Sequence, residues 1–91
     1  MRIRWTPAAV ADLQHINAYL KDYHPRYQLP TLRKVYEAIQ SLKQWPNRGR
    51  LGREDGTREF VFTPLPYIAV YRVKDQSIEV LRVYHAAQER R

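Results

Sequence analysis

His85 is the residue of this 91-residue chain whose side chain is best suited to acid–base chemistry. It follows the run Leu-Arg-Val-Tyr at positions 81–84, so we expect it at the end of the final strand. An imidazole titrates near neutral pH and can remove the proton from a ribose 2′-hydroxyl, which is the step that metal-free RNA cleavage requires. A single histidine at a strand end is more often structural, so both roles stay open.

A second group with chemical potential is a basic loop at positions 47–56. The stretch Asn-Arg-Gly-Arg-Leu-Gly-Arg-Glu-Asp-Gly contains all three glycines of the chain, and glycine lets the backbone approach a ligand closely. Guanidinium groups bind phosphate through paired hydrogen bonds, so several of them on one loop suit a polyanion. They are Arg48, Arg50 and Arg53, with Arg58 just after the loop. The alternative is a solvated surface loop whose charge Glu54 and Asp55 partly neutralise.

Three tyrosines of the predicted sheet, Tyr67, Tyr71 and Tyr84, have rings that could stack on unpaired bases. Tyr71 and Tyr84 are better explained as sheet core and cross-strand packing. Tyr67 begins a strand beside Pro66, so we expect it to be exposed.

Composition restricts the classes of site and partner. Sixteen Lys and Arg against nine Asp and Glu give a net charge of +7, which favours nucleic acid, the ribosome, an anionic membrane or an acidic protein. The chain has no cysteine and three separated histidines, so we expect no metal site and no cofactor. We find no secretory signal and no apolar run of membrane-spanning length, and therefore expect a cytoplasmic protein without a membrane partner. Residues 1–91 are predicted to form one domain.

The first predicted helix begins at Thr6-Pro7, where threonine supplies an N-cap and proline suits the first turn. Apolar residues then recur at spacings of three and four, which indicates one buried face. They are Ala9, Leu13, Ile16, Leu20 and Tyr23. His15 and His24 lie off this face and are expected on the surface.

A second apolar stripe predicts another helix, made of Leu32, Val35, Ile39 and Leu42 and ending before Pro46. Its start is open. A start at Pro25 or Arg26 places Pro30 near or just beyond the first turn, where it can kink the helix, and a start after Gln28 avoids this. Trp45 is expected to close the core at the far end.

Four segments are typical of strands, a short one at 2–5 and three rich in β-branched and aromatic residues at 57–63, 67–73 and 78–84. The turn at 74–77 makes the last two a hairpin, and their two largely apolar faces place them at the centre of the sheet. The order is β-α-α-β-β-β. We predict an α+β fold in which a helical hairpin packs on one face of an antiparallel sheet.

Three strings carry a resemblance to a known family: Gly-Thr-Arg-Glu at 56–59, Pro-Tyr-Ile-Ala-Val-Tyr-Arg-Val at 66–73 and Leu-Arg-Val-Tyr-His at 81–85. With the two helical segments and the basic loop before them, the chain resembles the RelE/ParE superfamily, the toxins of bacterial type II toxin–antitoxin modules. The resemblance covers nearly the whole chain in order.

The first mechanism that the resemblance implies is cleavage of mRNA in the ribosomal A site. Several RelE-like nucleases use the histidine that matches His85 in catalysis, so here His85 is the expected base, with Arg58 holding phosphate and Tyr67 orienting the nucleotide. The further residues expected to contact nucleic acid are Arg48, Arg50, Arg53 and Arg82.

The chain departs from the nuclease pattern at two places. Many RelE-like nucleases carry an arginine where this chain has Tyr67, and loss of such a charge costs roughly 3 to 4 kcal/mol of transition-state stabilisation. Arg58, Arg82 or Arg50 are the candidates to replace it. Residues 86–91 also lack the tyrosine of the nuclease C-terminal helix. The alternative mechanism is therefore a ParE-like inhibitor of DNA gyrase with no catalytic activity, and a third interpretation is a basic nucleic-acid-binding domain or an inactive toxin relative.

The resemblance further implies a cognate antitoxin encoded beside the toxin and a toxin–antitoxin hetero-oligomer. A partner for a surface of charge +7 should be acidic, disordered alone and ordered on binding. We expect an amphipathic helix of this partner on the helical hairpin, and an extended segment on a sheet edge or over the arginine loop and His85.

Overall fold

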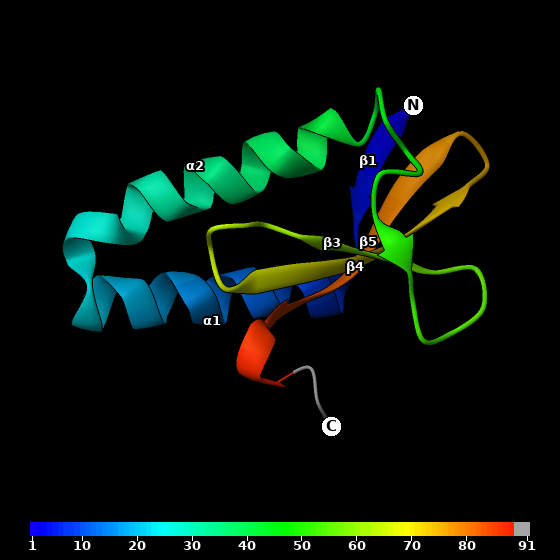
Figure 1. Cartoon of the computed structure of the whole chain (residues 1–91). Helices are drawn as coiled ribbons and strands as arrows, with labels where there is room; N and C mark the ends of the chain where they lie inside the picture. Colours follow the sequence, from blue (N-terminus) through cyan, green and yellow to red (C-terminus); the bar gives the residue numbers. More distant parts are fainter. Residues whose placement is uncertain (89–91) are drawn as a thin grey trace.

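The computed structural model describes residues 1–88 as two helices, a five-stranded sheet and a short C-terminal 3-10 helix. The elements in chain order are β1 (Arg2–Trp5), α1 (Pro7–Tyr23), α2 (Pro25–Ser41), β2 (Arg50–Leu51), β3 (Arg58–Val61), β4 (Tyr67–Lys74), β5 (Ser77–His85) and η1 (Ala86–Gln88). Figure 1 shows α1 and α2 as an antiparallel hairpin beside the sheet. The predicted α+β fold is confirmed.

Local signals fix the start of both helices. The Thr6 hydroxyl accepts the N–H of Ala9 at 3.1 Å, which is the predicted N-cap of α1. The second helix begins at Pro25, the earlier of the two possible starts, and continues through Pro30. Tyr23 was expected on the buried face of α1, but it is 68% exposed because the hairpin extends beyond the sheet at that end.

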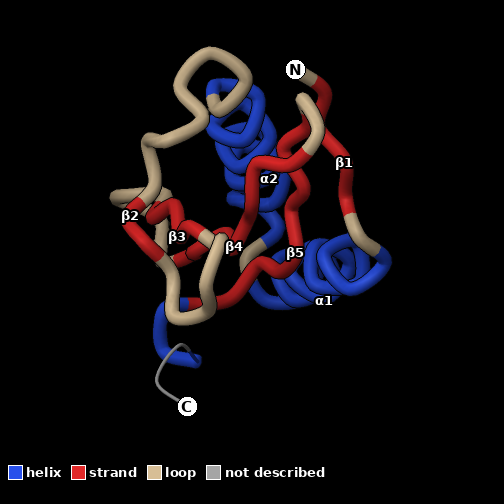
Figure 2. The backbone as a smooth tube through the Cα atoms, turned by 90° about the vertical axis from the view of Figure 1, so that its right-hand side faces the viewer, coloured by secondary structure: helices blue, strands red, loops and turns tan. Residues whose placement is uncertain are grey.

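The sheet has the order β1-β5-β4-β3-β2, so β4 and β5 are the central strands, as predicted (Figure 2). It is mixed rather than wholly antiparallel, because β1 pairs in parallel with β5. Strands joined by a tight turn must be antiparallel, whereas almost the whole chain separates β1 from β5 and no local pattern sets their direction. The two-residue strand β2 lies within the segment predicted as a loop.

The core lies between the helices and one face of the sheet. Its largest fully buried side chains are Tyr71, Ile39, Leu42, Ile78, Val35 and Val80. A register shift between Val70 and Tyr71 in the β4–β5 ladder leaves Leu81 as an extra residue on β5. Trp45 was expected to close the core, but it is 59% exposed. Leu42 instead fills the end of the core, and the chain turns outward directly after it.

Candidate functional site

His85 lies in an open cavity of about 910 Å³ between the helical hairpin and the end of the sheet. Residues of α1 and the first turns of α2 form one wall, while the β3–β4 loop and the last residues of β5 form the other. All three histidines of the chain contribute to the lining, together with Tyr19, Tyr27, Tyr67 and Tyr84. The cavity is therefore rich in aromatic and imidazole rings.

The exposed side chain of His85 packs against Tyr67, which lies directly opposite it in the β4–β5 ladder. Their ring centroids are 5.6 Å apart at an interplanar angle of 86°, an edge-to-face arrangement. His85 Nδ1 accepts the backbone N–H of Ala87 at 3.1 Å. This hydrogen bond assigns the proton of the neutral imidazole to Nε2, because Nδ1 must keep its lone pair to accept.

Tyr67 was expected to be exposed, but it is only 6% exposed. Its ring is buried against His85 and the hydrophobic core. Burial raises the pKa of the Tyr67 hydroxyl, and the nearby Tyr19 hydroxyl raises it further. The phenol therefore stays neutral and supplies no charge to the cavity. The local sequence Pro-Tyr gave no sign that β5 would place His85 against this ring.

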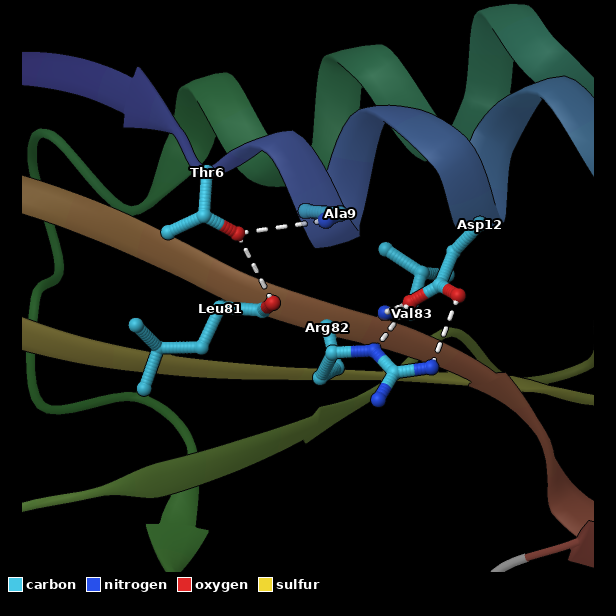
Figure 3. Close-up of polar contacts among 6 residues, drawn as sticks. All are labelled: Thr6, Ala9, Asp12, Leu81, Arg82 and Val83. Atoms are coloured by element: carbon cyan, nitrogen blue, oxygen red, sulfur yellow. Dashed lines mark hydrogen bonds and ion pairs between the residues drawn. The ribbon is translucent and has the colours of Figure 1, made fainter.

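Arg82 enters the same cavity but is bound to Asp12 of α1, as Figure 3 shows. Its Nε and Nη2 donate to the two carboxylate oxygens at 2.8 and 3.0 Å. This hydrogen bonding to Asp12 raises the pKa of the Arg82 guanidinium. Arg82 is thus a fixed cation whose charge the adjacent carboxylate largely balances.

Asp12 also completes the outer edge of β5. β1 pairs with β5 only as far as Val80, so beyond that point the backbone groups on this edge of β5 have no strand beside them, while β4 continues on the other edge. The Thr6 hydroxyl donates to the carbonyl of Leu81 at 2.9 Å, and the Asp12 carboxylate accepts the N–H of Val83 at 2.8 Å (Figure 3). Side chains at the start of α1 thereby take the place of strand pairing.

The arginines of the basic loop are held by the protein itself. Arg50 on β2 donates to Glu59 Oε1 on β3 through Nε at 3.0 Å and Nη2 at 2.8 Å. Arg48 donates to Ser41 Oγ at 3.1 Å, and its guanidinium lies 4.9 Å from the centre of the Phe60 ring. Arg53 lies exposed on the turn between β2 and β3.

Arg58 is bound to the backbone of the same loop. Its Nη1 donates to the carbonyls of Gly49 at 2.8 Å and Asn47 at 3.3 Å. Tyr71 supports the loop from below: its hydroxyl accepts the N–H of Gly49 at 2.9 Å and donates to the carbonyl of Pro46 at 2.7 Å. Arg58 and Tyr71 therefore fix the path of the chain that carries Arg48 and Arg50.

The structure does not bring Arg58 and His85 together. Arg58 lies opposite Tyr71 on β4, whereas His85 lies opposite Tyr67 on the same strand. Tyr67 and Tyr71 are four positions apart, which corresponds to about 13 Å along the strand. Within residues 1–88, Arg82 is the one Lys or Arg side chain that lines the cavity.

Sequence reasoning missed the contribution of α1 to this cavity. Asp12, His15 and Tyr19 are spaced by three and four residues, so they share one face of the helix, and all three line the cavity. This polar spacing is visible in the sequence, but the prediction for this helix used only the apolar stripe beside it. His24 was correctly placed at the surface, and it lines the same cavity.

No helix within residues 1–88 is long and apolar enough to cross a membrane. In the same residues, no three His, Asp or Glu side chains are placed to hold a metal ion.

Comparison with known proteins gives one consistent result. Residues 3–90 match the family model described as the ParE toxin of the type II toxin–antitoxin system parDE. "Putative toxin Y4kP" of Sinorhizobium fredii is 38% identical over 88 residues, covering 97% of this chain and 91% of the relative. "Toxin RelE2" of Caulobacter vibrioides is 34% identical over 87 residues, covering 96% and 97%.

Solved structures agree with the sequence comparison. The chromosomal ParDE toxin–antitoxin system from P. aeruginosa superposes with a TM-score of 0.85 at 30% identity, covering 93% of this chain and 95% of that chain. The toxin–antitoxin complex RelBE2 from Mycobacterium tuberculosis gives a TM-score of 0.62 at 27% identity, covering 96% and 92%.

Proposed function

We propose, from the premise that this chain belongs to the ParE toxin family and is the toxin of a type II toxin–antitoxin module, that it inhibits DNA gyrase by binding. The family fixes the toxin role. The choice of target rests on the chemistry available around His85.

The observation that carries the proposal is the charge of the His85 cavity. Cleavage of RNA through its 2′-hydroxyl builds up negative charge on a phosphorane, which a nuclease must stabilise with cations. Arg82 is the one Lys or Arg side chain among residues 1–88 that lines the cavity, and Asp12 binds it through both carboxylate oxygens. The arginines of the basic loop lie along a different part of the sheet.

The protonation of His85 supports the same choice. A general base needs a lone pair directed at the substrate, but the Nδ1 lone pair of His85 is engaged by the N–H of Ala87. The protein itself thus engages the nitrogen lone pair that would have to accept the proton of a 2′-hydroxyl.

The test separates DNA synthesis from translation. The toxin is expressed from a tight promoter, and incorporation of labelled thymidine and methionine is followed separately. The proposal expects early loss of thymidine incorporation with DNA-damage signalling, and inhibition of supercoiling by purified gyrase in vitro. His85→Gln should keep most of the growth inhibition. Early loss of methionine incorporation with unaffected gyrase would refute the proposal.

Ribosome-dependent mRNA cleavage is the second candidate, and one observation favours it. His85 is exposed in a cavity that also contains Tyr67 and Arg82, so a base, a hydroxyl and a cation are near one another. In that mechanism His85→Gln should remove most toxicity, because general-base catalysis contributes about 10² to 10⁴ in rate. Loss of toxicity in a folded variant, together with cleaved mRNA in the wild type, would establish it.

The proposed partner is an acidic antitoxin that covers the outside of the helical hairpin. Two large apolar side chains there are exposed, Tyr36 at 58% and Val10 at 41%. A groove of about 360 Å³ lies between the two helices beside Val10 and Tyr36. An amphipathic helix of the antitoxin would bury these residues, while its acidic residues would partly neutralise the net charge of +7.

Co-purification with the product of the adjacent small open reading frame tests this partner. Binding to the folded toxin alone should raise its stability by about 4 kcal/mol when free antitoxin is a thousandfold above its dissociation constant. Tyr36→Glu should weaken the complex more than Lys21→Glu, an exposed change on the other helix that alters the charge by two units instead of one. A neighbour that neither binds nor relieves toxicity would contradict the proposal.

A further inference from the structure

Four cations of β1 and β4 share the face of the sheet that is turned away from the core. Arg4 and Arg72 both lie opposite Glu79 of β5, while Arg2 and Lys74 both lie opposite Ser77. Residues directly opposite in a sheet point to the same side, so all four side chains lie on the face of Glu79 and Ser77. We call Arg2, Arg4, Arg72 and Lys74 the basic ladder.

The other face of the same strands confirms this orientation. Ile3 and Trp5 alternate with Arg2 and Arg4 on β1, and Ile78 and Val80 alternate with Ser77 and Glu79 on β5. All four apolar side chains pack in or against the hydrophobic core. Figure 2 shows the N-terminus beside the β4–β5 turn, where Arg2 and Lys74 are located. The basic ladder is thus at the opposite end of β5 from His85.

The basic ladder carries a charge excess that its one carboxylate does not balance. Glu79 Oε1 lies 2.6 Å from Arg72 Nε, and Glu79 Oε2 lies 3.8 Å from Arg4 Nη1. Four cations around one carboxylate leave a net charge of +3. The Arg4 and Arg72 side chains are 63% and 43% exposed, and Arg2 and Lys74 are exposed as well. All four therefore present charge to solvent.

We infer that the basic ladder binds the phosphodiester backbone of duplex DNA. The ladder has two columns of cations, one on β1 and one on β4, with β5 between them. Two strand spacings separate the columns by about 10 Å, and the two cations of each column are about 7 Å apart. This spread is comparable to the width of about 12 Å of the B-DNA major groove, whose edges are lined by phosphates.

The residues between the columns favour this ligand over two others. Where β1, β5 and β4 lie side by side at this end of the sheet, the positions of this face are Arg2, Arg4, Arg72, Lys74, Ser77 and Glu79, none of them aromatic or aliphatic. Further along the same face, beyond the end of β1, β4 continues with Val70 and Ile68 and β5 with Tyr84. Single-stranded RNA is held by stacking on rings, which the basic ladder lacks. Protein interfaces depend on buried aromatic and apolar anchors, which it lacks too. Cations without rings or apolar anchors between them suit contacts to the phosphates of a duplex, which position a protein without reading its sequence.

DNA binding by the basic ladder is independent of the gyrase proposal, since it needs no protein target. The experiment uses purified full-length toxin and a labelled 20-base-pair DNA duplex. Anisotropy is measured between 50 and 200 mM salt. Each phosphate contact contributes about 0.9 to the salt slope, so four contacts predict a loss of affinity of about 150-fold over this range. The double variant Arg2→Gln, Lys74→Gln retains two contacts and should lose about 12-fold.

The matched control is Lys21→Gln, Lys43→Gln, which removes the same charge from exposed positions outside the ladder. It should keep the wild-type salt dependence. Glu79→Gln removes the carboxylate between Arg4 and Arg72 and should tighten binding at 50 mM salt. Circular dichroism and thermal unfolding verify that each variant is folded.

Three results would overturn the inference. One is a wild-type toxin that does not bind the duplex. Another is a control variant whose salt slope falls as much as that of the ladder variant, because net charge alone would then explain binding. The third is a ladder variant that loses affinity for the antitoxin while its affinity for DNA is unchanged, which would assign the face to an acidic protein.

Discussion

Replacing Tyr71 by phenylalanine tests how the loop that carries Arg48 and Arg50 is held in place. The substitution removes one oxygen atom and keeps the ring, which is fully buried. Two hydrogen bonds are lost, the N–H of Gly49 to the hydroxyl at 2.9 Å and the hydroxyl to the carbonyl of Pro46 at 2.7 Å. Only the partly exposed Pro46 can turn to water, since Gly49 is buried.

The expected cost follows from the buried N–H that is left without an acceptor. Such a group costs about 1 to 3 kcal/mol, so we expect the free energy of unfolding to fall by about 2 kcal/mol. For a domain of this size that corresponds to a decrease in Tm of about 8 to 16 °C. Tyr36→Phe is the matched control, because its side chain is 58% exposed and its hydroxyl can hydrogen-bond to water. It should change stability by less than about 0.5 kcal/mol.

Urea unfolding of both variants gives the comparison, and hydrogen exchange locates the effect. In Tyr71→Phe the amide of Gly49 should exchange faster, while amides in the middle of β5 change only by the loss of global stability. A Tyr71→Phe variant as stable as Tyr36→Phe, or with an equally protected Gly49 amide, would refute the view that this hydroxyl anchors the loop.

Three further predictions concern other parts of the structure. Gly49→Ala places a Cβ 2.8 Å from the carbonyl oxygen of Glu59 and 2.9 Å from Tyr71 Cε1, and should lower the free energy of unfolding by about 1 to 3 kcal/mol. Urea unfolding measures this, and an unchanged midpoint would show that the loop moves to accommodate the methyl group. Asp12→Ala leaves the N–H of Val83 unpaired and should lower the free energy of unfolding by about 1 to 3 kcal/mol, a loss that added salt should hardly restore. Recovery of the stability in 1 M salt would mean that repulsion between cations causes the loss. Hydrogen bonding from Arg72 lowers the pKa of Glu79, so the wild type should be more stable than Glu79→Gln above the ordinary pKa of 4.5 and should lose this extra stability as the pH falls through the lower pKa of the folded state. Thermal unfolding from pH 7 to pH 3 measures the difference in stability. A difference that stays constant with pH would contradict the assignment.

The parts of the fold that follow from short-range signals were predictable from sequence. Thr6 followed by proline fixed the start of α1, and alternation of apolar residues identified the strands. The two-sided apolar pattern of the last hairpin placed it at the centre of the sheet, and the structure confirms this. Each of these signals involves residues within a few positions of one another.

The features that were missed depend on partners distant in the sequence. Tyr67 is buried against His85 of β5 and the hydrophobic core, and Trp45 is exposed because Leu42 already fills the end of the core. The arginine loop looked like a free polyanion site, but Arg50 is bound to Glu59 across two strands whose pairing the sequence did not reveal. A count of charges predicts the sign of a surface and leaves open which charges already have partners.

The parallel pairing of β1 with β5 has a consequence for how the protein is made. Thr6 and Leu81, which are hydrogen-bonded at the end of this pairing, are 75 residues apart. Pairing over such a separation is slow to form, because the entropy of closing the long intervening chain is lost before any contact compensates for it. During synthesis at 5 to 20 residues per second, β1 waits about 4 to 15 seconds for its partner to emerge. Until β5 has been synthesised, the growing chain lacks the strand that completes both the sheet and the His85 cavity, so each toxin molecule acquires this surface seconds after β1 has been made.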